Sequence, residues 1–452
     1  MSIHAIILAA GQGTRMRSSL PKVLHRLAGR PMLQHVLDAA AGVPVKMQHV
    51  VIGHAGDAVR GAIPDAGIRW VEQQQQLGTG HAVMRALPSI PDDEQVLVLY
   101  GDVPLVQPET LRLLLAAAAD APALLSVNLP DPTGYGRILR SADGEVEGIV
   151  EHKDATAEQR RISEVNSGLM AAPAGVLRRC LARCGNDNAQ GEYYLTDIVA
   201  LAVREGLPVQ AVVSANADEV AGVNDRRQLA HLERVFQRTE ADRLMAAGVT
   251  LADPARIDIR GALDCGQDVL IDINCVFEGS VSLAPGVQIG PNCVLRDTRV
   301  GAGSVIEANS LLDGTTVGEA VQVGPFARLR PGTVLADASK VGNFVEIKQA
   351  SLGKGSKANH LSYIGDATIG NGVNIGAGTI TCNYDGKHKH STVIEDRVFI
   401  GSDTQLVAPV TVGAGAVVGA GTTVTRDVAA DSLVTSRVDQ AEVPGWAKRR
   451  RG

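Results

Sequence analysis

The 452-residue sequence lacks an excess of positive charge and has only one short basic run. Lysine and arginine total 43 against 49 aspartates and glutamates, which gives a net charge of -6. A polyanion usually requires a basic domain, so this balance argues against a nucleic-acid partner. The basic run at 448–451 is interpreted as a solvated tail, with a phosphate contact as the alternative.

Paired cysteines, a secretion signal and long apolar runs are also missing. The six cysteines form no C-x-x-C pair and no zinc-type spacing, so reduced thiols of a cytoplasmic protein are the simplest interpretation. The first residues carry neither a basic segment nor a signal-peptidase site. The best apolar stretch, 111–127, is interrupted by Asp120 and Pro122, so no membrane span is expected.

The length suggests two or three domains, and the sequence pattern changes near residue 225. Before that point, strand-like apolar runs over 49–53, 95–100 and 123–127 alternate with helical patterns such as 111–119. This alternation predicts an α/β, Rossmann-like domain with a mostly parallel sheet. Its ligand should lie beyond the carboxyl ends of the strands.

After residue 250 the sequence advances in six-residue steps. An aliphatic residue followed mostly by glycine recurs, as in "IGPNCV" from Ile289 and "VGAGSV" from Val300. This repeat predicts a left-handed parallel β-helix, in which three hexads close one triangular coil. The expected organisation is the α/β domain at 1–226, an amphipathic linker helix at 227–247 and a β-helix at 248–452.

A glycine-rich turn directly follows the first strand pattern. The segment "LAAGQGTRM" at 8–16 is not a dinucleotide fingerprint, because Met16 replaces the third glycine, and it is not a Walker loop. An ordinary tight turn is the alternative to a phosphate site. Two cations, Arg15 and the following Lys22, favour the phosphate site because they could neutralise charge as pyrophosphate leaves.

Polar residues in two further segments belong to the same candidate site. Gln73, Gly78 and Thr79 offer hydrogen-bonding groups for the edge of a base. Asp102 ends a strand beside the phosphate turn, where a carboxylate is suited to hold Mg²⁺. A turn residue before Pro104 is the alternative for Asp102.

The hexad register predicts a column of side chains in the β-helix. His360 occupies the third position of its hexad, and Ala377, Ser402 and Ala420 follow in that position on later coils. Small residues above a histidine leave a groove where an extended ligand could lie. The regular pattern breaks over 379–392, which is predicted to be a loop.

Charged and polar side chains are predicted near this histidine. Arg330 and Lys348 are 18 residues apart in one hexad position, and Glu346 and Tyr363 are 17 apart in another. Asn374 falls on an adjoining coil. Cations, an imidazole and a carboxylate that converge in this way favour a site over a histidine on a solvated face.

The interrupted segment raises a metal site as an alternative. His388 and His390 alternate with Lys387 and Lys389, and the pattern includes no carboxylate or thiol ligand set. A basic loop is therefore favoured over a metal site.

The motifs together resemble a known family. In chain order they are LAAGxGTRM, PKVL, QLGTGHA, YGDVPL, GYGRI, VEHKDA, NSG and GVND, followed by the hexapeptide repeats. This order resembles the bacterial bifunctional N-acetylglucosamine-1-phosphate uridylyltransferases and glucosamine-1-phosphate N-acetyltransferases, over nearly the whole chain. The resemblance implies a cytoplasmic homotrimer that makes UDP-N-acetylglucosamine for peptidoglycan and lipopolysaccharide.

The resemblance implies that the β-helix acetylates glucosamine 1-phosphate with acetyl-CoA. His360 would be the general base, and Glu346 would orient or polarise it. Arg330 and Lys348 would hold the sugar phosphate, while Tyr363 and Asn374 would contact the sugar. The residues implied to bind acetyl-CoA are Ala377, Asn383, Tyr384, Ser402, Ala420 and Arg437.

The resemblance also implies that N-acetylglucosamine 1-phosphate then attacks UTP in the first domain. Arg15 and Lys22 would stabilise the developing charge, and Asp102 with Asn224 would hold Mg²⁺. The remaining residues implied to bind nucleotide or sugar are Leu8, Ala9, Ala10, Gly11, Gln73, Gly78, Thr79, Tyr100, Gly101, Gly136, Glu151 and Asn166.

Two other interpretations stay open at this point. One is a glucose-1-phosphate nucleotidyltransferase whose β-helix does no chemistry. The other is a non-catalytic assembly or regulatory subunit. The gathering of Arg330, Lys348, His360 and Tyr363 disfavours the first, and the presence of Lys22 with Asp102 disfavours the second.

Overall fold

The computed structural model describes residues 2–11, 13–53, 55–64 and 67–450. The chain forms two compact units, Met1–Phe236 and Gln237–Gly452. Helix α7 (Arg226–Ala246) begins and ends close to the predicted linker helix, and the division between the units lies inside it. Among the described residues, no helix is both long and apolar enough to cross a membrane.

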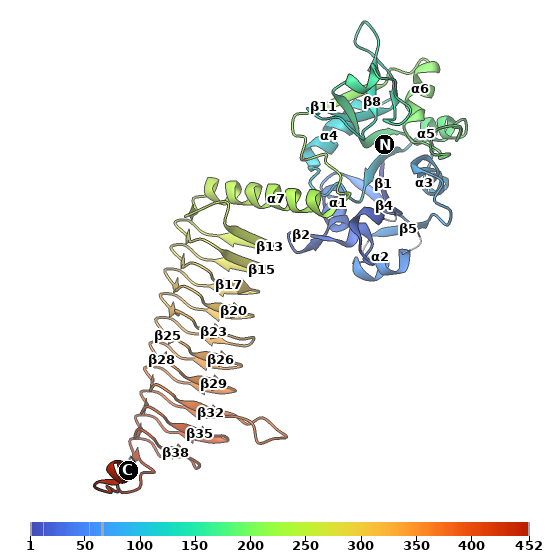
Figure 1. The fold of residues 1–452 in the computed structure, drawn as a ribbon. Helices are drawn as coiled ribbons and strands as arrows, with labels where there is room; N and C mark the ends of the chain where they lie inside the picture. The colour runs from blue at the N-terminus through green and yellow to red at the C-terminus, as the bar shows by residue number, and fades with distance from the viewer. Residues whose placement is uncertain (1, 12, 54, 65–66, 451–452) are drawn as a thin grey trace. The chain divides into compact units, whose positions relative to one another are not determined.

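The first unit is built on one twisted sheet, as the alternating pattern predicted (Figure 1). β10 runs antiparallel to both of its neighbours in the main path, and the other pairs along that path are parallel. In spatial order the strands are β11 (Gln210–Ser214), β7 (Ala123–Asn128), β10 (Glu164–Pro173), β6 (Gln95–Tyr100), β1 (Ile3–Leu8), β4 (Val45–Ile52) and β5 (Ile68–Glu72). A hairpin of β8 (Arg137–Arg140) and β9 (Val146–Val150) pairs with β10, and β2 (Arg26–Leu27) pairs with β3 (Arg30–Pro31).

Helices cover both faces of this sheet with separate apolar cores. On one face lie α1 (Met32–Ala41) and α4 (Pro108–Ala117), and on the other α3 (Thr79–Ala86), α5 (Ala174–Leu181) and α6 (Asp197–Arg204). The short α2 (Gly56–Ala62) and the 3₁₀ helices Thr14–Met16, Lys22–Leu24, Leu87–Ser89 and Gln159–Arg161 complete the unit. α4 begins earlier than the pattern over 111–119 indicated, because Pro108 suits the first turn of a helix.

The strand order brings two sequence-distant turns together. β1 and β6 are parallel neighbours, with Leu8 opposite Tyr100. The glycine-rich turn after β1 and Asp102 after β6 therefore lie at the same edge of the sheet, as expected from the sequence.

The second unit is a parallel β-helix whose coils stack along the chain (Figure 1). One sheet contains β12 (Thr250–Leu251), β14 (Leu270–Ile271), β16 (Gln288–Ile289), β19 (Val305–Ile306), β22 (Gln322–Val323), β25 (Lys340–Asn343), β28 (Lys357–His360), β31 (Asn374–Ile375), β34 (Phe399–Ile400), β37 (Val417–Val418) and β39 (Leu433–Val434). The other contains β13 (Ile257–Cys265), β15 (Cys275–Leu283), β17 (Val294–Arg296), β18 (Arg299–Val300), β20 (Leu311–Asp313), β21 (Thr316–Val317), β23 (Arg328–Leu329), β24 (Val334–Leu335), β26 (Glu346–Lys348), β27 (Ser351–Leu352), β29 (Tyr363–Gly365), β30 (Ala367–Ile369), β32 (Ile380–Cys382), β33 (Thr392–Ile394), β35 (Gln405–Val407), β36 (Val410–Val412) and β38 (Thr423–Val424).

The hexad pattern places its aliphatic residues inside the β-helix. Leu329, Ile347 and Ile364 are stacked in register on successive coils, and each is almost fully buried. Steps of 18 and 17 residues both occur, as the pattern predicted. A regular ladder of parallel strands thus encloses a narrow apolar core and leaves the remaining side chains outside.

The predicted loop over 379–392 is too long. β32 (Ile380–Cys382) and β33 (Thr392–Ile394) both pair in register with neighbouring coils, so the loop is confined to 383–391. The glycine hexad pattern is absent from β32, but Thr381 fills its buried position and donates a hydrogen bond to the carbonyl of Gly365. A buried threonine with a backbone partner continues the coil without an aliphatic residue.

The basic tail lies on the surface. α8 (Trp446–Arg449) is exposed, and the Arg450 guanidinium lies 5.1 Å from the centre of the Trp446 ring. Arg451, the last residue of the basic run, is outside the described residues.

Candidate active sites

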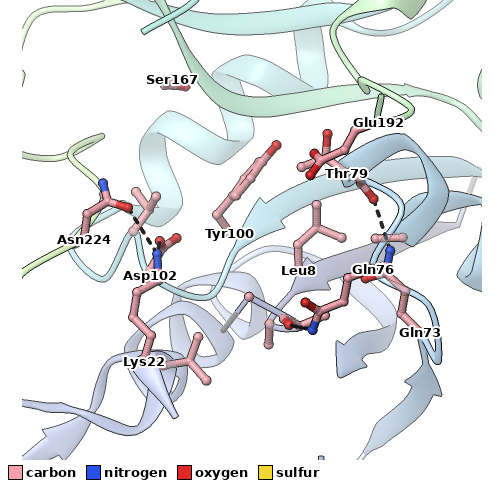
Figure 2. A pocket seen from close by; sticks show the side chains of 18 of the residues that line it. Leu8, Lys22, Gln73, Gln76, Thr79, Tyr100, Asp102, Ser167, Glu192 and Asn224 are labelled. Carbon is pink, nitrogen blue, oxygen red and sulfur yellow. Dashed lines mark hydrogen bonds and ion pairs between the residues drawn. The ribbon is translucent and has the colours of Figure 1, made fainter. Parts of the chain in front are cut away.

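A cavity of about 440 Å³ opens at the carboxyl edge of the first sheet. It is lined by Leu8, Ala9, Ala10, Gly11, Lys22, Val23, Gln73, Gln76, Gly78, Thr79, Ala82, Tyr100, Asp102, Val103, Tyr135, Ser167, Glu192, Gly222 and Asn224. In Figure 2, Lys22, Asp102 and Asn224 lie at one end, Gln73, Gln76 and Thr79 lie at the other, and Leu8 with Tyr100 lies between them. The lining therefore joins the glycine-rich turn to the predicted polar segments.

Charged groups concentrate at the first of these ends. The Lys22 ammonium donates to Asp102, and its Nζ lies 3.4 Å from Oδ1 of Asn224. Arg15 donates to the same Asn224 oxygen at 2.8 Å, although Arg15 does not line the cavity. Gly13 makes this approach possible, because a β-carbon there would lie only 2.6 Å from Cβ of Lys22.

The oxygen atoms at this end form a donor set for a hard cation. A carboxylate of Asp102 and a carboxamide oxygen of Asn224 already surround one positive charge, the Lys22 ammonium. Divalent cations such as Mg²⁺ take oxygen ligands of these two kinds and complete their shell with water and phosphate oxygens. The residues present therefore fit a divalent cation.

The opposite end is held by a segment that the sequence pattern did not reveal. Gly78 opens α3 with φ of 107°, and Gln73 donates to its carbonyl at 3.1 Å. The backbone of Tyr193 accepts from Gly80 and donates to Leu77, both at 2.8 Å. Tyr193 is far away in the sequence, so only the fold brings these two backbone hydrogen bonds to the α3 turn.

Several lining residues were missed by the sequence analysis. Tyr135, Ser167 and Glu192 all come from segments beyond β7. Tyr135 lies in the GYGRI motif and Ser167 in the NSG motif, where only Gly136 and Asn166 were predicted. Glu192 has no motif that connects it to the glycine-rich turn. Gln76 had a local signal, because it lies within the glutamine run before Gly78, and it donates to the Ala10 carbonyl at 2.6 Å. Gly222 lies beside Asn224 in the GVND motif.

Three of the residues implied to bind sugar form a neighbouring group outside the cavity lining. Asn166 donates its backbone N–H to the Gly136 carbonyl at 2.8 Å, and a β-carbon on Gly136 would lie 3.4 Å from the Glu151 carboxylate. Burial raises the pKa of Glu151, which accepts a hydrogen bond from Thr196 at 3.0 Å. Gly101 also lies outside the lining and donates its N–H to Leu8 at 3.0 Å.

Tyr100 connects this group to the cavity. Burial raises the pKa of its phenol, and the charges of Glu151 and Asp102 raise it further. The phenol is therefore neutral at physiological pH and can donate a hydrogen bond. Gly168 is required beside it, because a β-carbon at that position would lie 2.8 Å from the ring.

In the β-helix, the register agrees with the predicted column. Ala358 pairs with Ile375, Ile375 with Ile400, and Ile400 with Val418. Counting two residues on from each of these gives the column of His360, Ala377, Ser402 and Ala420. Arg437 reaches the last coil of this column, where its Nε donates to the Ala420 carbonyl at 3.2 Å.

The predicted polar residues lie on two sides of one corner. His360 ends β28, Tyr363 begins β29, and exposed Leu361 turns the corner between them. Glu346 is the register partner of Tyr363, as predicted, but its carboxylate pairs with Arg330 at 2.9 Å. Asn374 starts β31, in register with Lys357 on the coil of His360.

The imidazole of His360 is held by a residue that was not predicted. Its Nδ1 lies 2.8 Å from Oδ1 of Asn343, on the preceding coil. The expected partner, Glu346, is engaged with Arg330 instead. The difference arises because His360 and Asn343 end paired strands, whereas Glu346 belongs to the sheet on the other side of the corner.

The loop 383–391 adds a cation to this corner. Lys389 lies beside Lys348, and the proximity of the two ammonium groups lowers the pKa of Lys389. Asp385 accepts from the backbone of Lys387 and, at 2.8 Å, from the ring of His390. The loop thus has a carboxylate that the metal argument overlooked, yet within the described part of the chain no cluster of three metal-binding side chains occurs.

The two acetyl-CoA candidates in this loop have separate environments. Asn383 is buried and donates to Asp366, whereas Tyr384 is exposed and donates its hydroxyl to the Gly386 carbonyl at 2.7 Å. Asn383 therefore anchors the base of the loop, and the ring of Tyr384 is presented outside it.

Comparison with known proteins agrees with this division into two sites. Residues 5–160 match the MobA-like NTP transferase domain, 259–352 match the GMPPB C-terminal domain, and 391–426 match the bacterial transferase hexapeptide repeats. The bifunctional protein GlmU of Alkalilimnicola ehrlichii is 59% identical over 99% of this chain and 96% of its own length. Those of Marinobacter nauticus and Aromatoleum aromaticum are 56% and 57% identical over 99% of this chain and 98% of their own lengths.

The chain belongs to the GlmU family. It is accordingly a bifunctional enzyme of UDP-N-acetylglucosamine synthesis, with a nucleotidyltransferase in its first half and an acetyltransferase in its hexapeptide half. Membership of the GlmU family also removes the interpretation of the chain as a non-catalytic subunit.

Proposed function

We propose that the two described sites catalyse consecutive reactions of one pathway. The β-helix domain, 248–452, acetylates glucosamine 1-phosphate, and the domain at 1–226 then transfers UMP from UTP to the acetylated sugar phosphate. The helix at 227–247 connects them. The observation that carries this proposal is the Lys22–Asp102–Asn224 cluster at one end of a nucleotide-sized cavity, together with a histidine column on a separate unit.

In the acetyltransferase site, His360 acts as general base on the sugar amine as it attacks the thioester of acetyl-CoA. Arg330 and Lys348 bind the sugar phosphate. The position of Lys389 beside Lys348 supports a phosphate site here. The two ammonium groups repel each other unless an anion lies between them. Tyr363 and Asn374 contact the sugar.

Acetyl-CoA lies along the small-residue column. Ala377, Ser402 and Ala420 have small side chains that leave room along the outside of the β-helix. Arg437, at the end of the column, pairs with a phosphate of the coenzyme. Asn383 and Tyr384 border the same groove through the loop 383–391.

In the uridylyltransferase site, the sugar phosphate is itself the nucleophile, so the protein supplies binding, alignment and charge. Arg15 and Lys22 stabilise the charge that builds up as pyrophosphate leaves. The lining residues Leu8, Ala9, Ala10, Gly11, Gln73, Gly78 and Thr79 bind the uridine nucleotide. Tyr100, Gly101, Gly136, Glu151 and Asn166 form the sugar side.

We assign the divalent cation of this site to Mg²⁺, bound by Asp102 and Asn224. Both residues present oxygen atoms to one point at the phosphate end of the cavity. When bound, Mg²⁺ supplies charge neutralisation and alignment of the triphosphate. Lys22 donates to Asp102, and it would bind the phosphates where Mg²⁺ takes that carboxylate.

The assembly that we propose is a homotrimer formed through the β-helix. Phe326 and Phe344 stack at one corner with ring centres 5.4 Å apart, and Leu361 follows on the next coil. Their exposed fractions are 49%, 56% and 62%, which is unusual for large apolar side chains on consecutive coils. A neighbouring copy would cover this ridge. The cysteines are free among the described residues, which supports a reducing, cytoplasmic setting.

Pyrophosphate release tests the order of the two reactions. The chain is supplied with UTP, Mg²⁺ and glucosamine 1-phosphate, with and without acetyl-CoA. We expect release that depends on acetyl-CoA. Equal release without acetyl-CoA would show that the first domain accepts the unacetylated sugar, and would overturn the proposed order.

A further inference from the structure

The ring of His360 is fixed by the coil that precedes it. β25 ends at Asn343 and β28 at His360, and the two residues are partners in the parallel ladder. Oδ1 of Asn343 lies 2.8 Å from Nδ1 of the ring. A carboxamide oxygen can only accept a hydrogen bond, so Nδ1 carries the proton and Nε2 keeps a free lone pair.

We propose that Asn343 is a positioning residue for acetyl transfer, whose side-chain carbonyl selects the His360 tautomer and directs Nε2 toward the attacking amine. This inference rests on the proposed role of His360 as general base. As the amine nitrogen forms its bond to the thioester carbon, its proton moves to Nε2. The carbon–sulfur bond then breaks, and the imidazolium returns the proton to the departing sulfur.

Without this hydrogen bond the ring has two tautomers and can rotate, because His360 is exposed on the surface of the β-helix. The tautomer that carries its proton on Nε2 cannot accept a proton from the amine there. The bond to Asn343 also becomes stronger as the imidazolium forms, since a charged donor makes a shorter and stronger hydrogen bond. Asn343 therefore contributes more in the transition state than in the ground state.

An amide is suited to this place for an electrostatic reason. A carboxylate opposite Nδ1 would stabilise the imidazolium and keep more of the base protonated at neutral pH. Asn343 and His360 both line a cavity of about 460 Å³. Its lining also includes the charged Lys340 and the neutral Gln322 and Asn359. Asn343 orients the ring without adding a negative charge to it.

The test compares Asn343→Ala with Asn343→Asp in the full-length chain. Release of the CoA thiol is followed across the pH range in which histidine titrates, and uridylyl transfer and Tm are measured in parallel. Gln288→Ala is the matched control, because Gln288 is exposed on β16, an earlier strand of the same sheet. We expect Asn343→Ala to lower kcat for acetyl transfer by about tenfold or more, with KM and uridylyl transfer little changed.

Asn343→Asp should recover most of the lost kcat at alkaline pH, because the acceptor is restored. Its acid limb should move to higher pH, which a purely structural role would not produce. Unchanged kcat and pH profile in both variants would overturn the inference, and so would loss of both activities together with a lower Tm. If His360→Ala retained acetyl transfer, the proposed base itself would be wrong, whatever the Asn343 variants showed.

Discussion

The two units build their sites in opposite ways. In the first unit, Lys22 and Asp102 are half-enclosed by segments that only the sheet topology brings together, and their exposed side-chain fractions are 14% and 15%. In the β-helix, His360, Ser402 and Ala420 are exposed and Ala377 is half-buried, on a surface whose register repeats along the chain. Site geometry in the first unit therefore depends on long-range packing, whereas in the second it follows from the regular register of successive coils.

The difference also concerns where titratable groups are buried. Within the described residues, the buried histidines His4, His25 and His49 all belong to the first unit. The β-helix core consists of aliphatic residues with hydroxyl groups bonded to the backbone, such as Thr381 and Ser356. Protonation of buried histidines should therefore change the stability of the first unit rather than that of the β-helix core.

The largest effect expected in the β-helix is that of removing the proposed general base. His360→Ala should lower kcat for acetyl transfer by roughly 10² to 10⁴, because general base catalysis contributes about that factor. Uridylyl transfer should continue at the unaltered rate. The two half-reactions are assayed separately, each with its own sugar phosphate. Equal loss of both activities would show that the two sites do not function independently.

The reciprocal change in the first unit is Lys22→Ala. Uridylyl transfer should fall by about 10² to 10³, since one charged donor to the developing phosphate charge is lost. Acetyl transfer should not change. Lys46→Ala is the control, because Lys46 pairs with Glu94 and lies outside the cavity lining. A normal rate of UDP-sugar formation by Lys22→Ala would exclude Lys22 from the reaction.

Acidification should weaken the first unit through His49. Burial lowers the pKa of this imidazole to about 4, with His4 and Arg69 adding to the effect. At pH values between the ordinary histidine pKa of about 6.5 and this lowered value, the unfolded chain binds a proton that the folded chain does not. The free energy of unfolding should therefore decrease by up to about 3 kcal/mol as the pH falls through this interval. Urea unfolding followed by Trp70 fluorescence, in a Trp446→Phe background, measures this loss.

The matched variant for this measurement is His49→Gln, which keeps an acceptor for His4 but cannot titrate. Its unfolding free energy should depend less on pH over the same interval. The same pH dependence in both proteins would show that other groups of the first unit are responsible.

Removing Lys389, the cation that the loop adds to this corner, should have an intermediate effect. Lys389→Ala should raise KM for glucosamine 1-phosphate by about tenfold, since one charge-assisted hydrogen bond to phosphate is lost. Lys387→Ala, in the same loop, should leave KM within about a factor of two. Initial rates at saturating acetyl-CoA measure both constants. An equal rise of KM in the two variants would indicate a general effect of loop charge.

The smallest effect is expected on the outside of the β-helix. Glu278 bridges Arg260 and Arg296 on neighbouring coils, but both arginines are exposed and Glu278 is only half-buried. Glu278→Gln should change the unfolding free energy by less than about 1 kcal/mol. The adjacent Phe277 is buried, so Phe277→Ala should cost about 3 to 5 kcal/mol. Denaturant unfolding of both variants shows whether the core or the charge ladder stabilises the coils.

The sequence predicted much of the arrangement of residues at both candidate sites, and for different reasons. The column from His360 to Ala420 followed from the hexad period alone, because each coil of the β-helix repeats the same geometry. The glycine-rich turn and Asp102 were placed together because parallel strands share one carboxyl edge. Tyr193 and Glu192 were missed, because no local pattern connects them to the α3 turn.

The amino-acid pattern was sufficient to predict the two architectures, the strand edge that holds the cavity and the register of the β-helix. Those features follow from repeating patterns of apolar residues, which can be recognised within short segments of the chain. The folded chain was needed to show that Asn343 rather than Glu346 bonds to His360, that Lys389 lies beside Lys348, and that β32 continues the coil. Such choices depend on the direction in which side chains leave adjacent coils and loops, and a one-dimensional pattern does not specify that direction.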